Sequence, residues 1–235
     1  MPEPQILAFG GGRLYQEPER PVLIPYLLAQ ARKPRPRIGH IGTASGDGDR
    51  HTISFYSWFS AHDCVPSHLP LFARTPDIRD YLLSKDIIFV GGGNTRSMLA
   101  VWREWGLDEA LREAWQEGVV LAGSSAGAIC WFDQGVTDSW AGDLRAFRCL
   151  GFLSGSCCPH YDGEAQRRPR FHELVRSGET GGGLAIDDAA VAHFVGSELV
   201  RCVTSVRGSG VYTVERGSDG SAVETPLEMT LLENS

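Results

Sequence analysis

The chain is expected to fold as an α/β protein with a mostly parallel sheet and helices on both of its faces. Apolar runs of strand length alternate with segments of helical spacing over the first half of the chain, a pattern typical of parallel sheets built from strand–helix–strand units. Glycine, with 28 residues, collects where these strands end, which suits tight turns from strand to helix. At this length one domain with a sizeable core is possible, and we expect residues 1–235 to form a single domain.

The first half of the chain supplies the parallel strands. Strands are predicted where short apolar runs end in glycine or in turn-forming residues: 5–9, 37–44, 67–72, 86–90 and 119–122. Helices are predicted where apolar residues recur at helical spacing, with Gly106 separating the last two: 21–31, 51–62, 77–84, 97–105 and 107–116. A further helix is expected to start at Cys130-Trp131-Phe132.

The second half has a different character. After Trp140 the apolar segments are shorter, β-rich and separated by turns: 184–194, 198–206, 210–216 and 223–232. No linker precedes them. We therefore expect a β-rich C-terminal extension in the form of hairpins on the sheet edge, and not a second domain.

Composition excludes several classes of partner. A formal net charge of −7 argues against nucleic acid, and the one basic cluster, at residues 32–37, is interpreted as a solvated loop. No apolar run approaches the ~20 residues that a membrane span needs, and residues 1–12 lack the basic start of a signal peptide. We expect a cytoplasmic protein that binds neither nucleic acid nor membrane. The oligomeric state stays open, and a homodimer is one of the outcomes that the sequence allows.

The six cysteines predict neither disulfides nor a metal site. They contain no Cys-x-x-Cys pair, so in a reducing compartment we expect free thiols, several of them buried. Cys157-Cys158-Pro159-His160 does not have a usual zinc spacing. We expect no metal and no cofactor.

The segment Gly123-Ser124-Ser125-Ala126-Gly127 is the strongest functional signal. A serine flanked by glycine two residues before and two residues after it, between a strand and a helix, fits a nucleophile elbow. The amide of Ala126 could then point at an oxyanion. This predicts a serine hydrolase with Ser125 as nucleophile. The alternative is an ordinary Gly/Ser-rich turn of an α/β protein.

Two further glycine clusters follow predicted strands. Gly91-Gly92-Gly93-Asn94-Thr95 lacks the Gly-Lys-Ser/Thr of a phosphate-binding loop, and Gly10-Gly11-Gly12 lacks the spacing of a dinucleotide fingerprint. The strands before Gly91 and Gly123 could lie side by side. The Gly91 cluster would then aim a backbone amide at Ser125.

A serine nucleophile needs a base. His160 is the best candidate among the seven histidines, because it lies in a loop bounded by Pro159 and Gly163. His172 is placed on a helix face and His193 in a strand, where structural roles are expected. The acid that orients the base is expected at Asp187-Asp188, after a short apolar strand, with Asp138 and Asp162 as competitors.

Taken together, these motifs resemble the peptidase E family of serine peptidases, which includes aspartyl dipeptidases and cyanophycinases. The resemblance rests on the Gly91 and Ser125 motifs, on Pro159-His160-Tyr161 with the arginines that follow, and on Ile186-Asp187-Asp188. It covers roughly residues 39–194. It implies a flavodoxin-like three-layer sandwich similar to the class I glutamine amidotransferase domain.

The resemblance also implies roles for individual residues. Ser125 would be the nucleophile and His160 the base, and the amides of Gly93 and Ala126 would stabilise the oxyanion. Asp188 stands where the family often has Glu. Asp138 matches an acid that also occurs in the family after the nucleophile helix. Arginines after the histidine bind the acidic side chain of the substrate in aspartyl dipeptidases, so substrate binding is expected from Asn94, Arg167, Arg168 and Arg170.

The expected activity is hydrolysis of short peptides, with an acidic residue such as Asp on the N-terminal side of the scissile bond, through a Ser-His-Asp triad and an acyl-enzyme. Two alternatives remain open at this point. One is a catalytically idle member that binds an acidic metabolite or a partner, and the other is a small-molecule esterase.

Overall fold

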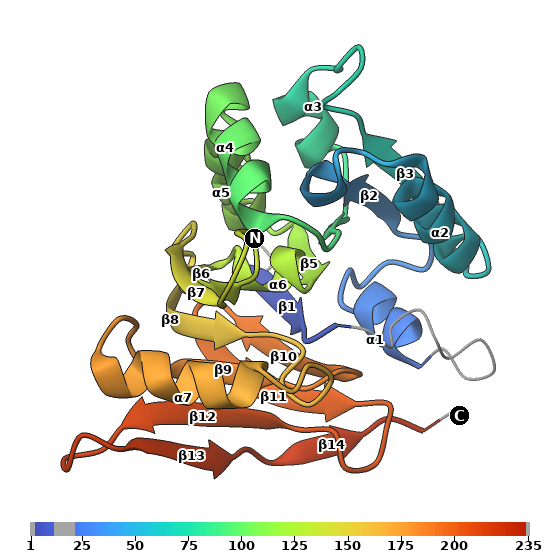
Figure 1. The fold of residues 1–235 in the computed structure, drawn as a ribbon. Helices are drawn as coiled ribbons and strands as arrows, with labels where there is room; N and C mark the ends of the chain where they lie inside the picture. Colours follow the sequence, from blue (N-terminus) through green and yellow to red (C-terminus); the bar gives the residue numbers. More distant parts are fainter. Residues whose placement is uncertain (1–2, 12–21, 234–235) are drawn as a thin grey trace.

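The computed structural model describes residues 3–11 and 22–233, and it contains two β-sheets with helices packed around them (Figure 1). The start of the first predicted helix, at residue 21, and Gly12 lie outside the described residues. The elements of the first half are β1 (Gln5–Phe9), α1 (Leu23–Ala29), β2 (Arg37–Ile41), a 3-10 turn (Thr43–Ser45), α2 (Asp49–Phe59), β3 (Val65–Leu69), α3 (Ile78–Leu83), β4 (Ile87–Val90), α4 (Thr95–Trp105), α5 (Leu107–Gln116) and β5 (Val120–Ser124).

The elements that follow are mostly strands: α6 (Ala126–Ile129), β6 (Phe132–Thr137), β7 (Arg145–Arg148), β8 (Leu153–Cys158), α7 (Arg167–Ser177), β9 (Gly183–Ile186), β10 (Ala190–Val195), β11 (Glu198–Thr204), β12 (Val211–Arg216), β13 (Ala222–Pro226) and β14 (Met229–Leu231). The main sheet has the order β14-β11-β10-β1-β5-β4-β2-β3, and the second sheet has the order β13-β12-β9-β8-β6-β7.

The centre of the main sheet is parallel, as predicted. β1, β5, β4, β2 and β3 run in the same direction, and Val90 at the end of β4 pairs with Gly123 near the end of β5. Parallel strands end at the same edge of a sheet, so the loops that follow them lie together. The Gly91 loop and the Ser125 turn are therefore neighbours, although more than 30 residues separate them.

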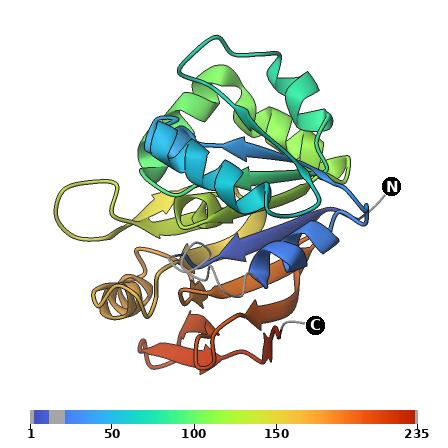
Figure 2. The same cartoon turned by 90° about the vertical axis from the view of Figure 1, so that its right-hand side faces the viewer.

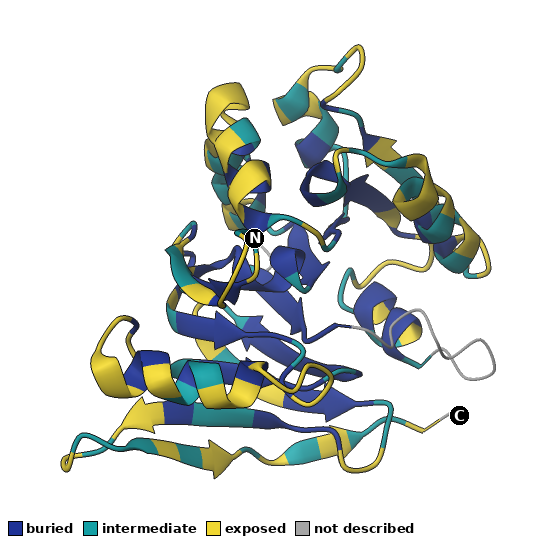
Figure 3. Ribbon diagram, viewed as in Figure 1, coloured by how far each residue is buried: buried dark blue, intermediate teal, exposed yellow. Residues whose placement is uncertain are grey.

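Helices cover both faces of this parallel part (Figures 1 and 2). On one face, α1 and α2 pack against Phe9, Ile38 and Phe89. On the other face, α4 and α5 bury Met98, Trp102 and Leu111 against the sheet. Strands β1, β2, β4 and β5 are buried along most of their length, whereas the edge strand β3 is only partly buried and the outer faces of the helices are exposed (Figure 3). The arrangement agrees with the predicted α/β sandwich.

The C-terminal strands do more than extend the edge of the sheet. β10, β11 and β14 do continue the main sheet beyond β1, but β9, β12 and β13 join β6, β7 and β8 in a second sheet. One face of this second sheet adds to the core under the main sheet. α7 covers its other face with Phe171, Leu174 and Val175. The expectation of hairpins on one edge was wrong in this respect, because the segments divide between two sheets.

The helix expected from Cys130 is also absent. α6 is a single turn that ends at Ile129, and Phe132 already begins β6. Trp131, between them, is fully buried and packs against Trp102 and Phe152. A short run of buried apolar residues fits a helix or a strand equally well, so its spacing could not distinguish the two.

All six cysteines are free and buried, as expected. Within the described residues, no helix combines the length and the apolar character that crossing a bilayer would require.

Candidate active site

Ser125 occupies a sharp turn between β5 and α6. Its backbone has φ 56° and ψ −113°, a conformation that residues other than glycine rarely adopt and that is often found at functional sites. A side chain at Gly123 would overlap the backbone of Gly127, and one at Gly127 would overlap the carbonyl group of Val90. The two glycines of the motif are therefore required by close backbone approach, as in a nucleophile elbow.

The Gly91 loop lies directly beside this turn. A Cβ atom built on Gly92 would lie 3.3 Å from Ser125 Cβ. Gly93 has φ 137°, and a side chain there would overlap the carbonyl group of Ala44. Because Ala126 is the first residue of α6, its amide belongs to the helix N-terminus, where backbone N–H groups lack intrahelical acceptors. The two predicted oxyanion donors, Gly93 and Ala126, thus flank the serine.

His160 is held by the loop that follows β1. Its backbone is also left-handed, with φ 52°, and its N–H donates to the carbonyl oxygen of Gly10 at 3.0 Å. A side chain on Gly11 would overlap the imidazole. The ring Nδ1–H donates to Asp188 Oδ1 at 2.8 Å. Since a carboxylate only accepts, this bond assigns the proton to Nδ1 and leaves Nε2 as the basic nitrogen.

The structure distinguishes the two adjacent acids. Asp188 meets the histidine, and its own N–H donates to Asp162 Oδ1 at 2.7 Å. Asp187 is buried on the opposite side, where it accepts from the Gly210 amide and the Tyr212 hydroxyl. Burial raises the pKa of the Asp187 carboxyl above its usual value. Asp187 therefore ties the β9–β10 turn to β12, and Asp162 supports Asp188 through its backbone.

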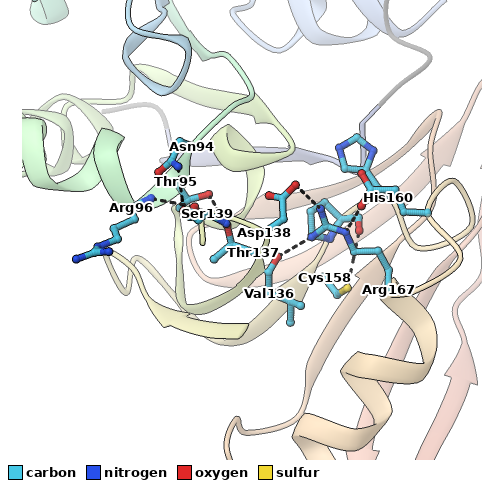
Figure 4. Close-up of polar contacts among 12 residues, drawn as sticks. Asn94, Thr95, Arg96, Val136, Thr137, Asp138, Ser139, Cys158, His160 and Arg167 are labelled. Atoms are coloured by element: carbon cyan, nitrogen blue, oxygen red, sulfur yellow. Dashed lines mark hydrogen bonds and ion pairs between the residues drawn. The ribbon is translucent and has the colours of Figure 1, made fainter. Parts of the chain in front are cut away.

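Asp138 faces an arginine instead of the histidine. Its side chain is 65% exposed, and its carboxylate lies 3.9 Å from Arg167 Nη2 (Figure 4). The His160 Nδ1–H bonds to Asp188, so the position of the acid that orients the ring is already filled.

Of the three arginines predicted to bind substrate, Arg167 lines a cavity together with Ser125. Arg167 is buried, donates to Glu164 and to the carbonyl oxygen of Val136, and lines a cavity with Ser125 and His160. Arg168 turns away to Glu224 and lies over the ring of Tyr161. Arg170 bonds to Glu173 and to the Leu144 carbonyl. Arg168 follows Arg167 directly and so points in a different direction, whereas Arg170 is held by its own partners, Glu173 and the Leu144 carbonyl.

Asn94 lines the same cavity, but its side chain is already engaged. Asn94 Oδ1 accepts from the Ser97 amide as the N-cap of α4, and Nδ2 donates to the carbonyl oxygen of Ser139. Asn94 therefore joins the Gly91 loop to the segment after β6 (Figure 4). Asn94 thus has a structural role at the cavity wall. Both polar atoms of its side chain are already bonded within the protein, which does not fit the expectation that they bind substrate.

The histidines set aside as structural lie away from Ser125. His172 on α7 contacts the Tyr161 hydroxyl and Glu224. His193 on β10 is buried, and its two ring nitrogens contact Tyr26 and Gln5. Burial lowers the pKa of His193 to about 4.

Ser125 and His160 lie between two cavities. The smaller one, of about 310 Å³, is polar and includes Asp138, Glu164 and Arg167 in its wall. The larger one, of about 520 Å³, lies under α2 and is lined by the aromatic residues Phe55, Trp58 and Phe89, with Arg50 and His51 from α2. Two cavities on either side of one serine and one histidine can hold the two residues that flank a peptide bond.

His40 and Gly11 were not identified from the sequence as site residues. His40 lines the larger cavity from β2, and its signal in the sequence was a lone polar residue in an apolar strand. Gly11 makes room for the His160 ring, and its signal was the glycine run after the first strand. His40 is far from Ser125 in the sequence, and Gly11 is far from His160, so no local pattern links either pair.

Comparisons with known proteins agree on one family. Residues 6–202 match the model of peptidase family S51. A relative from Bacillus subtilis (strain 168), "Uncharacterized peptidase YgaJ", is 48% identical over 229 residues, which cover 97% of this chain and 99% of the relative.

Two solved structures share the fold. A peptidase from an acI-B1 actinobacterium has a TM-score of 0.72 at 16% identity, covering 97% of this chain and 95% of its own. A putative peptidase E protein from Listeria monocytogenes EGD-e has a TM-score of 0.61 at 18% identity, covering 84% and 97%.

Proposed function

The chain belongs to peptidase family S51, the peptidase E family, and is a serine-type peptidase; we propose that it cleaves short peptides after an N-terminal aspartate, through a triad of Ser125, His160 and Asp188. The observation that carries the triad is the hydrogen bond from His160 Nδ1 to Asp188 beside a serine in the strained elbow conformation. The bond leaves His160 Nε2 free to act as the base.

The reaction follows from these positions. His160 Nε2 takes the proton of the Ser125 hydroxyl as Oγ attacks the peptide carbonyl carbon, and the amides of Gly93 and Ala126 stabilise the oxyanion. His160 returns the proton to the leaving amine as the C–N bond breaks, which leaves an acyl-enzyme on Ser125. A water molecule, deprotonated by the same nitrogen, then hydrolyses the ester and restores the serine.

The polar cavity suits an N-terminal aspartate. Arg167 offers a guanidinium group to the side-chain carboxylate, in place of its loose 3.9 Å pair with Asp138. The carboxylates of Asp138 and Glu164, in the same wall, suit the α-ammonium group of the substrate. An amino-terminal aspartate carries both charges, whereas an internal aspartate lacks the ammonium.

A dipeptide panel tests this proposal. Asp-Ala should be cleaved well, whereas the other three peptides should be poor substrates. Asn-Ala and Ala-Ala lack the carboxylate that would pair with the buried Arg167, and N-acetyl-Asp-Ala lacks the ammonium group that would face Asp138 and Glu164. Equal rates on all four peptides would reject acidic specificity. Arg167→Met should remove the preference for Asp over Asn. Arg170→Met is the matched control, because it removes the same charge from the same helix outside the cavity.

A further inference from the structure

The larger cavity contains a buried acceptor that the proposed mechanism does not use. His40 is 3% exposed, and its Nδ1 lies 3.2 Å from the carbonyl oxygen of Phe89. A carbonyl oxygen can only accept, so the proton is on Nδ1, and Nε2 carries a lone pair. Within the described residues, Nε2 has no hydrogen-bond partner. Buried polar atoms are normally paired, and an exception calls for an explanation.

His40 is fixed as a neutral acceptor. Its ring stacks on Phe55 at 4.7 Å with an interplanar angle of 15°. Burial lowers the pKa of His40 to about 4, so the ring is uncharged at neutral pH. A group that pairs with Nε2 must therefore bring its own N–H or O–H.

Two consecutive glycines connect this acceptor to the nucleophile. A Cβ atom on Gly91 would lie 3.0 Å from His40 Cε1, and one on Gly92 would lie 3.3 Å from Ser125 Cβ. No side chain of this loop separates the two residues. A substrate residue that enters the cavity from Ser125 therefore passes along bare backbone toward His40.

The remaining lining indicates a neutral aromatic occupant. Trp58 supplies aromatic surface in front of the buried rings of Phe55 and Phe89, and the volume of about 520 Å³ accepts a large side chain. No Asp or Glu is among the described residues that line the cavity, while Arg50 is. A cationic side chain would find no counter-charge there. Asp47 Oδ1, a second buried acceptor without a partner among the described residues, lies close to Gly42, as His40 Nε2 does, but Asp47 is not among the residues that line the cavity.

We propose that this cavity binds the residue on the C-terminal side of the scissile bond and selects tyrosine, whose hydroxyl donates to His40 Nε2. The inference rests on the proposed function for the direction of the peptide, and it makes Asp-Tyr a better substrate than Asp-Phe. The two peptides differ by one hydroxyl group, so the comparison isolates the hydrogen bond.

Binding and turnover are measured on separate proteins. Calorimetry on Ser125→Ala should show Asp-Tyr binding about tenfold more tightly than Asp-Phe, the effect of one buried hydrogen bond between neutral groups. In the unmodified enzyme, kcat/KM should favour Asp-Tyr by a similar factor. His40→Phe should bring both ratios close to one. His193→Phe is the matched control, because His193 is equally buried but both its nitrogens are bonded elsewhere, and it should keep both ratios.

The outcomes separate the two proposals. Asp-Tyr and Asp-Phe of equal affinity in Ser125→Ala would overturn the tyrosine subsite, even if Asp-Ala is cleaved. A preference for Asp-Lys would also overturn it and would place Asp47 within reach of the ligand. If no peptide is cleaved and a fluorophosphonate does not label Ser125, the proposed function fails, whereas the affinity ratio still reports on the cavity. The Tyr-to-Phe ratio of the unmodified cavity needs no substitution at His40, so it stands even if His40→Phe does not fold.

Discussion

The serine and the histidine of this site are held in place by different means. Ser125 is positioned by close backbone packing around three glycines: Gly92 in the loop after β4, Gly123 in β5 and Gly127 in α6. His160 is positioned by a loop carbonyl and a carboxylate, from Gly10 and Asp188. The first region tolerates no added atoms. The second depends on particular polar partners that come from distant parts of the chain.

The largest expected effect is the loss of either reacting group. Ser125→Ala and His160→Ala should each lower kcat for Asp-Ala by about 10⁴–10⁶, and the double variant should be hardly worse, because the two groups act as a unit. Thermal unfolding of both variants should stay close to that of the original protein. Full turnover by Ser125→Ala, or an intact His160→Ala beside an inactive His172→Ala, would refute the assignment.

Replacing each candidate acid by its amide tests which carboxylate orients His160. Asp188→Asn should lower kcat by about 10²–10⁴, because an amide no longer stabilises the charged ring and can favour the wrong tautomer. Asp138→Asn is the matched control, because it neutralises a carboxylate that faces Arg167, and its kcat should change by less than tenfold. The reverse result would assign the acid to Asp138.

One added methyl group should lower stability near Ser125 but should lower mainly kcat near His160. Gly127→Ala forces the new atom into the backbone of Val90, and we expect about 3 kcal/mol of lost stability in urea unfolding. Gly106→Ala is its control: φ there is 64° but the site is open, so only about 1–2 kcal/mol of backbone strain is expected. The methyl group of Gly11→Ala would overlap the His160 ring, which is a side chain that can move. We therefore expect a clear loss of kcat with little change in the free energy of unfolding. Equal stability losses at Gly127 and Gly106 would contradict the packing argument.

The smallest expected effect, counted per pH unit, is a dependence of stability on pH that arises from two buried histidines. Burial lowers the pKa of His40 and of His193 to about 4, whereas an unfolded histidine titrates near 6.5. Between these values the unfolded chain binds more protons, so the free energy of unfolding falls as the pH drops from about 6.5 to 4. Each histidine contributes about 1.4 kcal/mol per pH unit. His193→Phe should halve this part of the slope in urea unfolding at several pH values, and an unchanged slope would contradict it.

Much of the first half of the fold could be predicted because its signals are local. Buried parallel strands are continuous apolar runs, and β4 and β5 were found within one or two residues of their ends. The glycines around Ser125 follow from sterics within five consecutive residues. Two strands in the same direction also place their loops at one edge, which brought the Gly91 loop beside Ser125.

The second half was less predictable because strand partners are chosen by the tertiary structure. Cys130, Trp131 and Phe132, which follow Ile129, are all fully buried, so this short run is apolar throughout and shows no clear period. β9 and β10 are adjacent in the chain, yet they belong to different sheets. The sequence of neither strand alone indicates which sheet it joins.

Residue types at fixed spacing were enough to predict the elbow serine, the parallel core and a short set of candidate bases and acids. Which of these candidates meet depends on how the chain is folded. Asp187 and Asp188 have the same chemistry, but the β9–β10 turn directs one to β12 and the other to His160. Arg167 lines the cavity with Ser125, whereas Arg168 bonds to Glu224 and Arg170 bonds to Glu173 and the Leu144 carbonyl. The direction in which a side chain points depends on the path of the backbone and on the residues that pack against it. Neither can be predicted from the identity of the residue alone.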